Sequence, residues 1–330
     1  MASFLFSYLQ MPDYSIFGGC LRSDLTFSEL RELSSGTASW TFSAVDTIEE
    51  MESPQLLGEA ELSAECRVRL FEHAAGFRFE YDDTGSYDVA TDGRTIQWCA
   101  GPKPDNSSVR ADITGRVLAM ALHASGRLCL HGSAVAMGDG AVAFVAPKYH
   151  GKSTLALALA RAGCRLMTDD VFPVDPGPPA IAIPGVHQVR LWDDSAELFD
   201  VRRGQPLPGD KHLVHEISDE LLMFQPDSLR AVYLLSPLTG ESSMVEAARR
   251  IPMPDVTAAL ALVRHAALGP LLGGDQAART FERAATLAST VPVYRLETVA
   301  GLDRLNDVVV QLQEWHGTAS APPVAAGEGM

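Results

Sequence analysis

The stretch "FVAPKYHGKSTLALALARAGCRLMTDD", Phe144 to Asp170, decides the fold of this chain. It opens on the end of an apolar run and passes through a Gly-Lys-Ser-Thr turn that starts at Gly151. Leucine and alanine then repeat as they do in a buried helix, until Gly163 ends the pattern. A second apolar run follows and closes on two aspartates. Strand, glycine loop, helix and strand in this order predict an α/β fold around a phosphate-binding loop.

Such a loop holds an anion with converging backbone N–H groups and with the positive end of the helix that follows. In this pattern the lysine, here Lys152, reaches the outer phosphates of a nucleotide, and the next hydroxyl, that of Ser153, ligates Mg²⁺. The predicted nucleotide-binding residues are Ala146, Pro147, Lys148, Tyr149, His150, Gly151, Lys152, Ser153 and Thr154.

The loop departs from the usual pattern at its opening and in its middle. Ala146 stands at the place of the first glycine, and Tyr149 and His150 occupy positions where small residues are more usual. Crowding by these side chains weakens anion binding, whereas Lys148 and a protonatable His150 add positive charge beside the anion. We expect nucleotide binding to be retained. The alternative is a helix start that merely reads Gly-Lys-Ser-Thr.

Asp169 and Asp170 end the second predicted strand, and Asp169 comes 16 residues after Ser153. A loop after one strand and an acid pair after a neighbouring strand converge on one crevice of an α/β sheet. One carboxylate can hold Mg²⁺, directly or through water, and the other can take the proton of an attacking hydroxyl. The alternative for the pair is a solvated turn or a helix cap.

The composition of the 330-residue chain is that of a globular protein, with 46% hydrophobic and 21% charged residues. The formal net charge of −16 argues against nucleic acid and anionic membranes as partners, because both require a basic surface. The five cysteines form no CxxC pair, so neither a disulfide framework nor a zinc site is predicted. No apolar run approaches the length of a membrane span, and we expect a cytoplasmic protein.

The composition and periodicity of the sequence change along the chain and predict three segments. Residues 1–108 read as a smaller β-rich domain, an antiparallel meander of short alternating runs such as "FRFEY". Residues 109–316 begin with a helix from Val109 to about Gly126 and then carry the phosphate-loop pattern and further strands and helices. The Pro/Gly-rich stretch "DPGPPAIAIPG" in this segment is expected to be a loop, and residues 317–330 a disordered tail.

The segment "HGSAVAMGDGAVAFVAPKYHGKSTLALALARAGCRLMTDD", His131 to Asp170, resembles the catalytic core of the HPr kinase/phosphorylase family. It is more similar still to the shorter HPr-kinase-like serine kinases of peptide-modification clusters, including lasso-peptide kinases. The resemblance runs in weaker form to the last predicted helix. It implies an α/β P-loop domain of the HPr-kinase and phosphoenolpyruvate-carboxykinase type, with a mixed sheet flanked by helices.

The resemblance also implies roles for individual residues. Lys152 would bind the β-phosphate and Ser153 would ligate Mg²⁺. Asp169 would be the base on the acceptor hydroxyl, and Asp170 would assist the metal or the base. His131 falls on the family's histidine near the phosphates.

Two further basic residues match the family downstream. Arg190 falls where the family has an arginine after a carboxylate, but Gln188 replaces that acid, which puts one metal ligand of the full HPr kinases in doubt. Lys211 matches a basic position that neutralises the transferring phosphate, its alternative being a surface lysine in a loop. The family's signature for the reverse phosphorolysis is missing, so the resemblance implies a kinase and not a phosphorylase.

The function expected from the sequence is transfer of the γ-phosphoryl group of ATP, with Mg²⁺, to a serine hydroxyl of a peptide or small protein. One alternative is a small-molecule kinase of the same fold that acts on free serine or another metabolite hydroxyl. Another is an ATP-binding sensor or scaffold without catalysis, and a phosphoenolpyruvate-carboxykinase-like activity ranks last. The β-rich domain is expected to select the acceptor, and the oligomeric state, a homo-oligomer included, stays open.

Overall fold

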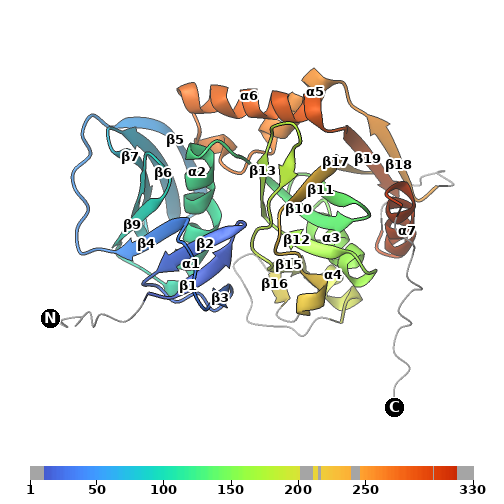
Figure 1. Cartoon of the computed structure of the whole chain (residues 1–330), viewed down its shortest axis with the longest axis horizontal. Helices are drawn as coiled ribbons and strands as arrows, with labels where there is room; N and C mark the ends of the chain where they lie inside the picture. Colours follow the sequence, from blue (N-terminus) through green and yellow to red (C-terminus); the bar gives the residue numbers. More distant parts are fainter. Residues whose placement is uncertain (1–10, 201–210, 215–216, 239–245, 300, 318–330) are drawn as a thin grey trace, which may run out of the picture. The chain divides into compact units, whose positions relative to one another are not determined.

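The computed structural model describes residues 11–200, 211–214, 217–238, 246–299 and 301–317. The chain forms two compact units, Met1–Ser125 and Gly126–Met330 (Figure 1), and each is described by itself. The sequence places the boundary at 108, before the predicted helix, but the structure places it after that helix. The reason is that the helix packs on the sheet of the first unit.

The first unit is built on a nine-stranded sheet with the order β3-β1-β2-β4-β9-β8-β7-β6-β5. Strands β5 to β9 form the predicted antiparallel meander, each paired with the next. Strand β4 pairs parallel with both β2 and β9, so the sheet as a whole is mixed rather than antiparallel. The strands are β1 (Asp13–Ile16), β2 (Gly19–Ser23), β3 (Arg31–Leu33), β4 (Trp40–Ala44), β5 (Gln55–Ser63), β6 (Cys66–His73), β7 (Gly76–Tyr81), β8 (Gly85–Ala90) and β9 (Thr95–Ala100).

The helical segment of this unit consists of α1 (Asn106–Asp112), a π-helical turn (Ile113–Val117) and α2 (Leu118–Ala124). It begins at Asp105, whose carboxylate caps the helix by accepting from the Ser108 backbone N–H at 2.9 Å. The carboxylate of Asp112 accepts from the Thr84 hydroxyl at 2.7 Å and so ties the helix to the sheet. A Cβ at Gly93 would lie 2.4 Å from the carbonyl oxygen of Ala121, so the helix lies directly against this turn.

The second unit contains an eight-stranded mixed sheet. Strand β10 pairs antiparallel with β11, β12 and β13, and β17 pairs parallel with β11 and β19. Because β14 joins β13 to β17, the pairings close a ring through β10, β11, β17, β14 and β13. The strands are β10 (Leu128–Met137), β11 (Gly140–Val145), β12 (Arg165–Thr168), β13 (Val171–Asp175), β14 (Ile181–Ala182), β17 (Asp227–Leu238), β18 (Ala248–Pro252) and β19 (Val293–Val299).

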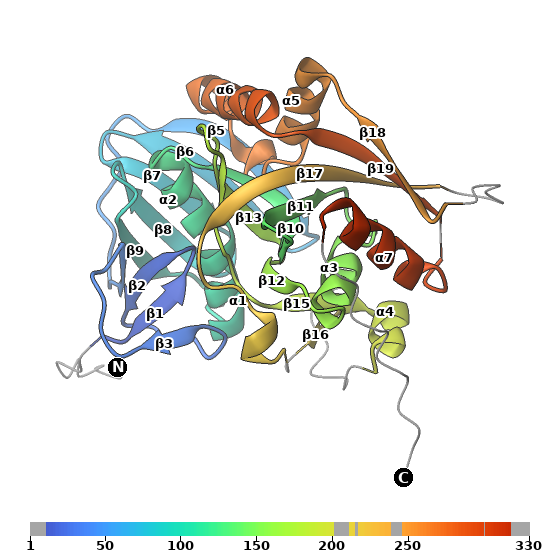
Figure 2. The ribbon, with the colours of Figure 1, turned by 45° about the vertical axis from the view of Figure 1, so that its right-hand side comes forward.

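Helices cover both faces of this sheet (Figure 2). Alternate side chains of the central strands point into two different cores, one on each face of the sheet. On one face, Phe144 and Tyr233 pack with residues of α3 (Lys152–Arg161) and α7 (Leu305–Trp315). Val145 and Val232 pack with residues of α5 (Asp255–Arg264) and α6 (Gly274–Thr290). A strand buried on both faces reads as a continuous apolar run, which is how β11 appears in the sequence. The predicted mixed sheet flanked by helices is therefore confirmed.

A two-stranded ribbon lies beside α3. In this ribbon β15 (Val189–Trp192) pairs antiparallel with β16 (Lys211–Val214). The short helix α4 (Asp193–Leu198) follows β15 in the chain. The stretch expected to be a loop contains the two-residue strand β14, which pairs antiparallel with both β13 and β17. The predicted tail lies outside the described residues from 318 onward. Among the helices of the described ranges, none is both long and apolar enough to cross a membrane.

Candidate active site

The loop between β11 and α3 is shaped by two left-handed residues. Gly151 precedes the first turn of α3 with φ +81°, a conformation that costs an L-residue about 1–2 kcal/mol. A Cβ at this position would meet no atom within 4 Å, so glycine is required here by the backbone and not by space. Tyr149 has φ +69° and carries the same conformational cost without being glycine.

The bulk of Tyr149 lies outside the loop. Its ring stacks on the ring of Trp192 in β15, with centroids 4.5 Å apart and planes inclined by 25°, and the residue is 74% exposed. The Nδ1 atom of His150 donates locally to the carbonyl oxygen of Lys148 at 2.8 Å. The side chain that was expected to crowd the loop is thus held against the β15–β16 ribbon.

Lys152 is the cation of the loop, although it is only 7% exposed. Its Nζ donates to the carbonyl oxygens of Ala146 at 2.9 Å and Pro147 at 3.1 Å. These bonds hold the amine beneath the loop, and the first backbone N–H groups of α3 have no partner within the helix. Together with the helix dipole, amine and N–H groups make this end of α3 a place for an anion.

The acid pair lies directly beside this helix start. The Ser153 hydroxyl donates to Oδ1 of Asp169 at 3.0 Å, and the Ser133 hydroxyl, from β10, donates to the same oxygen at 2.5 Å. Asp169 is 5% exposed, and burial, then the charge of Asp170, raises its pKa against the lowering effect of the two serines and Lys152. The predicted convergence of loop and acid pair is present.

Asp170 has a different environment from its neighbour. Its side chain is 56% exposed, and its φ of +80° turns the backbone sharply after Asp169. The Nδ1 atom of His131 lies 3.0 Å from Oδ1 of Asp170 and 3.1 Å from its carbonyl oxygen. His131 and Ser133 are alternate residues of β10 and therefore share one face of the strand, where each contacts one of the two aspartates.

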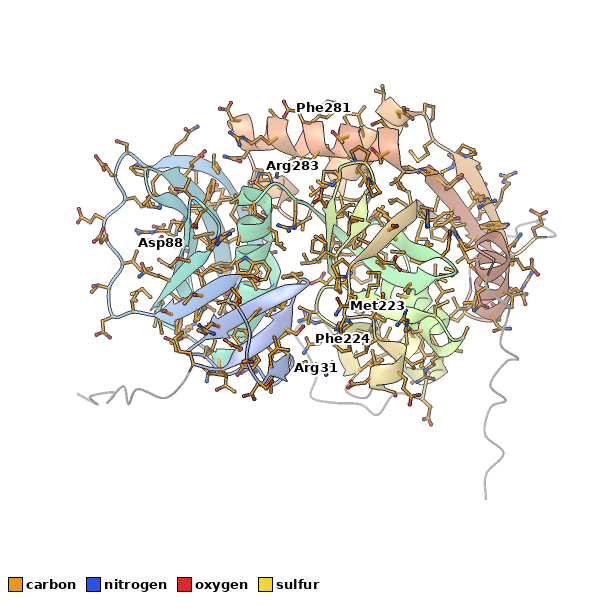
Figure 3. The ribbon with its side chains drawn as sticks, in the orientation of Figure 1. Arg31, Asp88, Met223, Phe224, Phe281 and Arg283 are labelled. Atoms are coloured by element: carbon orange, nitrogen blue, oxygen red, sulfur yellow. The ribbon has the colours of Figure 1, made fainter. Side chains whose placement is uncertain are left out.

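The strand that ends in the acid pair is also held along its outer edge. The backbone N–H of Met223 donates to the carbonyl oxygen of Leu166 in β12 at 2.8 Å. The His187 ring bonds the carbonyl oxygen of Met223 at 2.9 Å and packs edge-on against Phe224, labelled beside Met223 in Figure 3. Strand β12 is thus fixed from both sides before the chain reaches Asp169.

Three other predicted residues lie near the loop in different ways. The Thr154 hydroxyl is 2.9 Å from that of Ser195 in α4, so its side chain bonds there. In β15 the apolar residues on either side of Arg190 are buried, which places Arg190 on the same strand face as Trp192. Lys211 pairs with Trp192 across the ribbon, and its side chain lies outside the described residues.

Two residues of this region are not predicted by the sequence pattern, namely Ser133 and His265. Ser133 follows His131 by two positions in a strand, a period that could have marked it as a neighbour. His265, at the end of α5, had no local signal, but its carbonyl oxygen accepts from the His131 N–H at 2.6 Å. Burial, then the charges of Lys152, His131 and His150, lower the pKa of the His265 imidazole to about 4.

The oxygen donors suit a hard cation that arrives with a nucleotide. A serine hydroxyl and two carboxylates are ligands that Mg²⁺ accepts, and Mg²⁺ in such sites completes its shell with phosphate oxygens and water. Within the described ranges, no cluster of three or more His, Cys, Asp or Glu residues could hold a metal by itself. Ser153 and the acid pair therefore fit Mg²⁺ only as part of a larger ligand set.

Comparisons with known proteins add little to this geometry. No family model matches the chain, and no curated protein matches it. Among solved structures, it is similar to the HPr(Ser) kinase/phosphatase from Coxiella burnetii, with 12% sequence identity and a TM-score of 0.30. The match covers 57% of this chain and 89% of that one, and at this TM-score it carries no weight for function.

Proposed function

We propose that the second unit is an ATP- and Mg²⁺-dependent kinase that transfers the γ-phosphoryl group to a hydroxyl acceptor. The observation that carries the proposal is the hydrogen bond from Ser153 to Asp169, 3.0 Å long. It joins the Gly-Lys-Ser helix start to the acid pair, so an anion at the helix and a hydroxyl at the carboxylates would meet in one place. A phosphate loop used for binding alone has no need of this second element.

The donor end of the reaction would be held by the loop and α3. Lys152 is already fixed by two carbonyl oxygens, so little ordering remains when its charge meets a phosphate. Mg²⁺, when bound, would supply positive charge that offsets the negative charge developing on the phosphates during transfer. On this chain Ser153 and one carboxylate would hold it. Arg190, on the ribbon face next to Trp192, is proposed to act on the same charge, and so is Lys211.

The two aspartates support different roles. Asp169 is buried and its Oδ1 accepts from Ser153, which fits a residue that orients the metal-binding hydroxyl. Asp170 is exposed and paired with His131, which fits a base that an incoming acceptor can reach. The geometry therefore supports Asp170 as the base, whereas the family resemblance implies that role for Asp169. The acceptor O–H would give its proton to this carboxylate as the new O–P bond forms and the bond to ADP breaks.

The acceptor proposed is a serine hydroxyl of a peptide or small protein. Purified protein incubated with γ-labelled ATP, Mg²⁺ and candidate serine peptides tests this directly, with D170N as the control for contaminating kinases. Label on a peptide, lost in D170N, supports the proposal. Label on free serine or another small molecule would move it to a metabolite kinase. ATP binding without transfer to any acceptor would replace the kinase with a nucleotide sensor.

A further inference from the structure

Ser133 is a fully buried serine in the middle of β10, and its hydroxyl lies 2.5 Å from Oδ1 of Asp169. A hydroxyl at that depth has to find a partner, because burial without a hydrogen bond costs about 1–3 kcal/mol. Its partner is the carboxylate of Asp169 in the acid pair rather than a backbone carbonyl. Ser133 therefore belongs to the proposed phosphoryl-transfer site although it is a strand residue.

The pairing is produced by an irregularity in the sheet. Strand β10 aligns His131 with Val171 and Ala134 with Thr168, a register that brings Ser133 opposite Asp169. Between Ala134 and Val135 the register shifts by one residue of β12, as in a β-bulge. With the register of the far side of the bulge, Gly132 would stand opposite Asp169 and would offer it no side chain. Bulges commonly re-aim side chains in this way next to active sites.

Ser133 and Ser153 both hydrogen-bond the Oδ1 atom of Asp169. Ser133 comes from the sheet and Ser153 from the first turn of α3, and both donate to Oδ1 of Asp169. A carboxylate held at one oxygen by two donors has its rotation fixed, and its second oxygen keeps a constant direction. In a site with low local dielectric these charge-assisted bonds are strong. The orientation of Ser153 therefore depends on Ser133 through Asp169.

We propose that Ser133 is a positioning residue of the site: it fixes the carboxylate of Asp169 so that the Ser153 hydroxyl is oriented toward a magnesium–nucleotide complex. The inference rests on the proposed function, since it assigns Ser133 a part in nucleotide binding with Mg²⁺. The expected consequence is specific. Loss of the Ser133 hydroxyl should reduce the gain in nucleotide affinity that Mg²⁺ provides, because the residues behind metal ligands typically contribute about 10–100-fold to metal affinity or activity.

The chain offers a matched control for the substitution Ser133→Ala. Ser195 is also buried and also bonds a hydroxyl of α3, that of Thr154, at 2.9 Å, but it contacts neither aspartate. Ser195→Ala removes a comparable buried hydrogen bond from the same helix. Ser133→Thr keeps the hydroxyl at the critical place and serves as the conservative rescue.

The measurement is ADP affinity by calorimetry with and without Mg²⁺ for the full chain and the three variants, together with thermal unfolding. We expect S133A to lose about 10–100-fold of the Mg²⁺-dependent gain, S195A to keep it, and S133T to recover it. An equal loss of the Mg²⁺-dependent gain in ADP affinity in S133A and S195A would overturn the positioning role of Ser133, even if both variants unfold at lower temperature. A wild-type chain whose ADP affinity is independent of Mg²⁺ would instead overturn the proposed kinase function, and the two failures are distinct.

Discussion

The hydroxyl of Ser153 donates a 3.0 Å hydrogen bond to Oδ1 of Asp169, across a separation of 16 residues. This bond links the first turn of α3 to the end of β12. One residue belongs to a helix start and the other follows a strand, so the sequence pattern predicts that the two elements converge, but only the structure shows which atoms bond. The bond makes the lysine loop and the acid pair one arrangement.

The two aspartates should respond differently to amidation. D170N is expected to lower kcat by about 10²–10⁴, the usual contribution of a general base, while the affinity for MgADP stays near that of the wild type. D169N is expected to weaken MgADP binding, because its buried carboxylate orients Ser153. Steady-state kinetics give kcat and calorimetry gives the MgADP affinity of both variants, which tests the two roles. A D169N variant that binds MgADP normally but has lost turnover would restore the sequence-based assignment of Asp169 as the base.

Replacement of Lys152 should damage both binding and stability. K152M removes the charge that meets the phosphates and leaves the carbonyl oxygens of Ala146 and Pro147 without this donor, at a cost of about 1–3 kcal/mol. Tripolyphosphate titration and urea unfolding measure the two effects separately. The exposed neighbour Lys148 provides the control, and K148M should leave stability unchanged. A comparable loss of stability in K148M and K152M would contradict the structural role given to Lys152.

Gly151 and Gly163 form a matched pair for testing backbone strain. Both have left-handed φ values, +81° and +94°, and at neither would a Cβ meet an atom within 4 Å. G151A and G163A should therefore each cost about 1–2 kcal/mol of unfolding free energy. Only G151A should weaken nucleotide binding, because only Gly151 shapes the phosphate loop. Unaltered ADP affinity in G151A would show that the loop conformation is not needed for binding.

The second unit should lose stability at acid pH through His265. Burial and nearby positive charges lower the pKa of its imidazole to about 4 in the folded chain, from an ordinary value of 6.5. The unfolded chain therefore binds the proton more readily, and stability present above pH 6.5 is lost as the pH falls toward 4. Urea unfolding from pH 7 to pH 4.5 should show a shallower loss for H265N than for the wild type. Parallel curves would exclude this histidine as a source of the effect.

The sequence predicts the structure correctly where the pattern of neighbouring residues decides it. The strand, loop and helix from β11 through α3 follow from an apolar run, a left-handed glycine and a leucine-alanine repeat. The aspartates could be singled out because they follow the end of a strand, whereas His131 is identified only through the resemblance to the family's histidine. The sequence did not predict that the Thr154 hydroxyl bonds Ser195, nor that the helix of residues 106–124 packs with the first unit. In both cases the partner lies far away in the sequence.

By itself, the sequence determined that the second unit is an α/β structure with a Gly-Lys-Ser-Thr helix start followed by an acid pair, because these features are local in the chain. Only the tertiary structure decided which side chains hold that acid pair. The register of β10 against β12, set by one bulge, brings Ser133 to Asp169, and the packing of α5 brings His265 to His131. Strand register and helix packing depend on contacts between distant residues, and a local pattern contains no information about them.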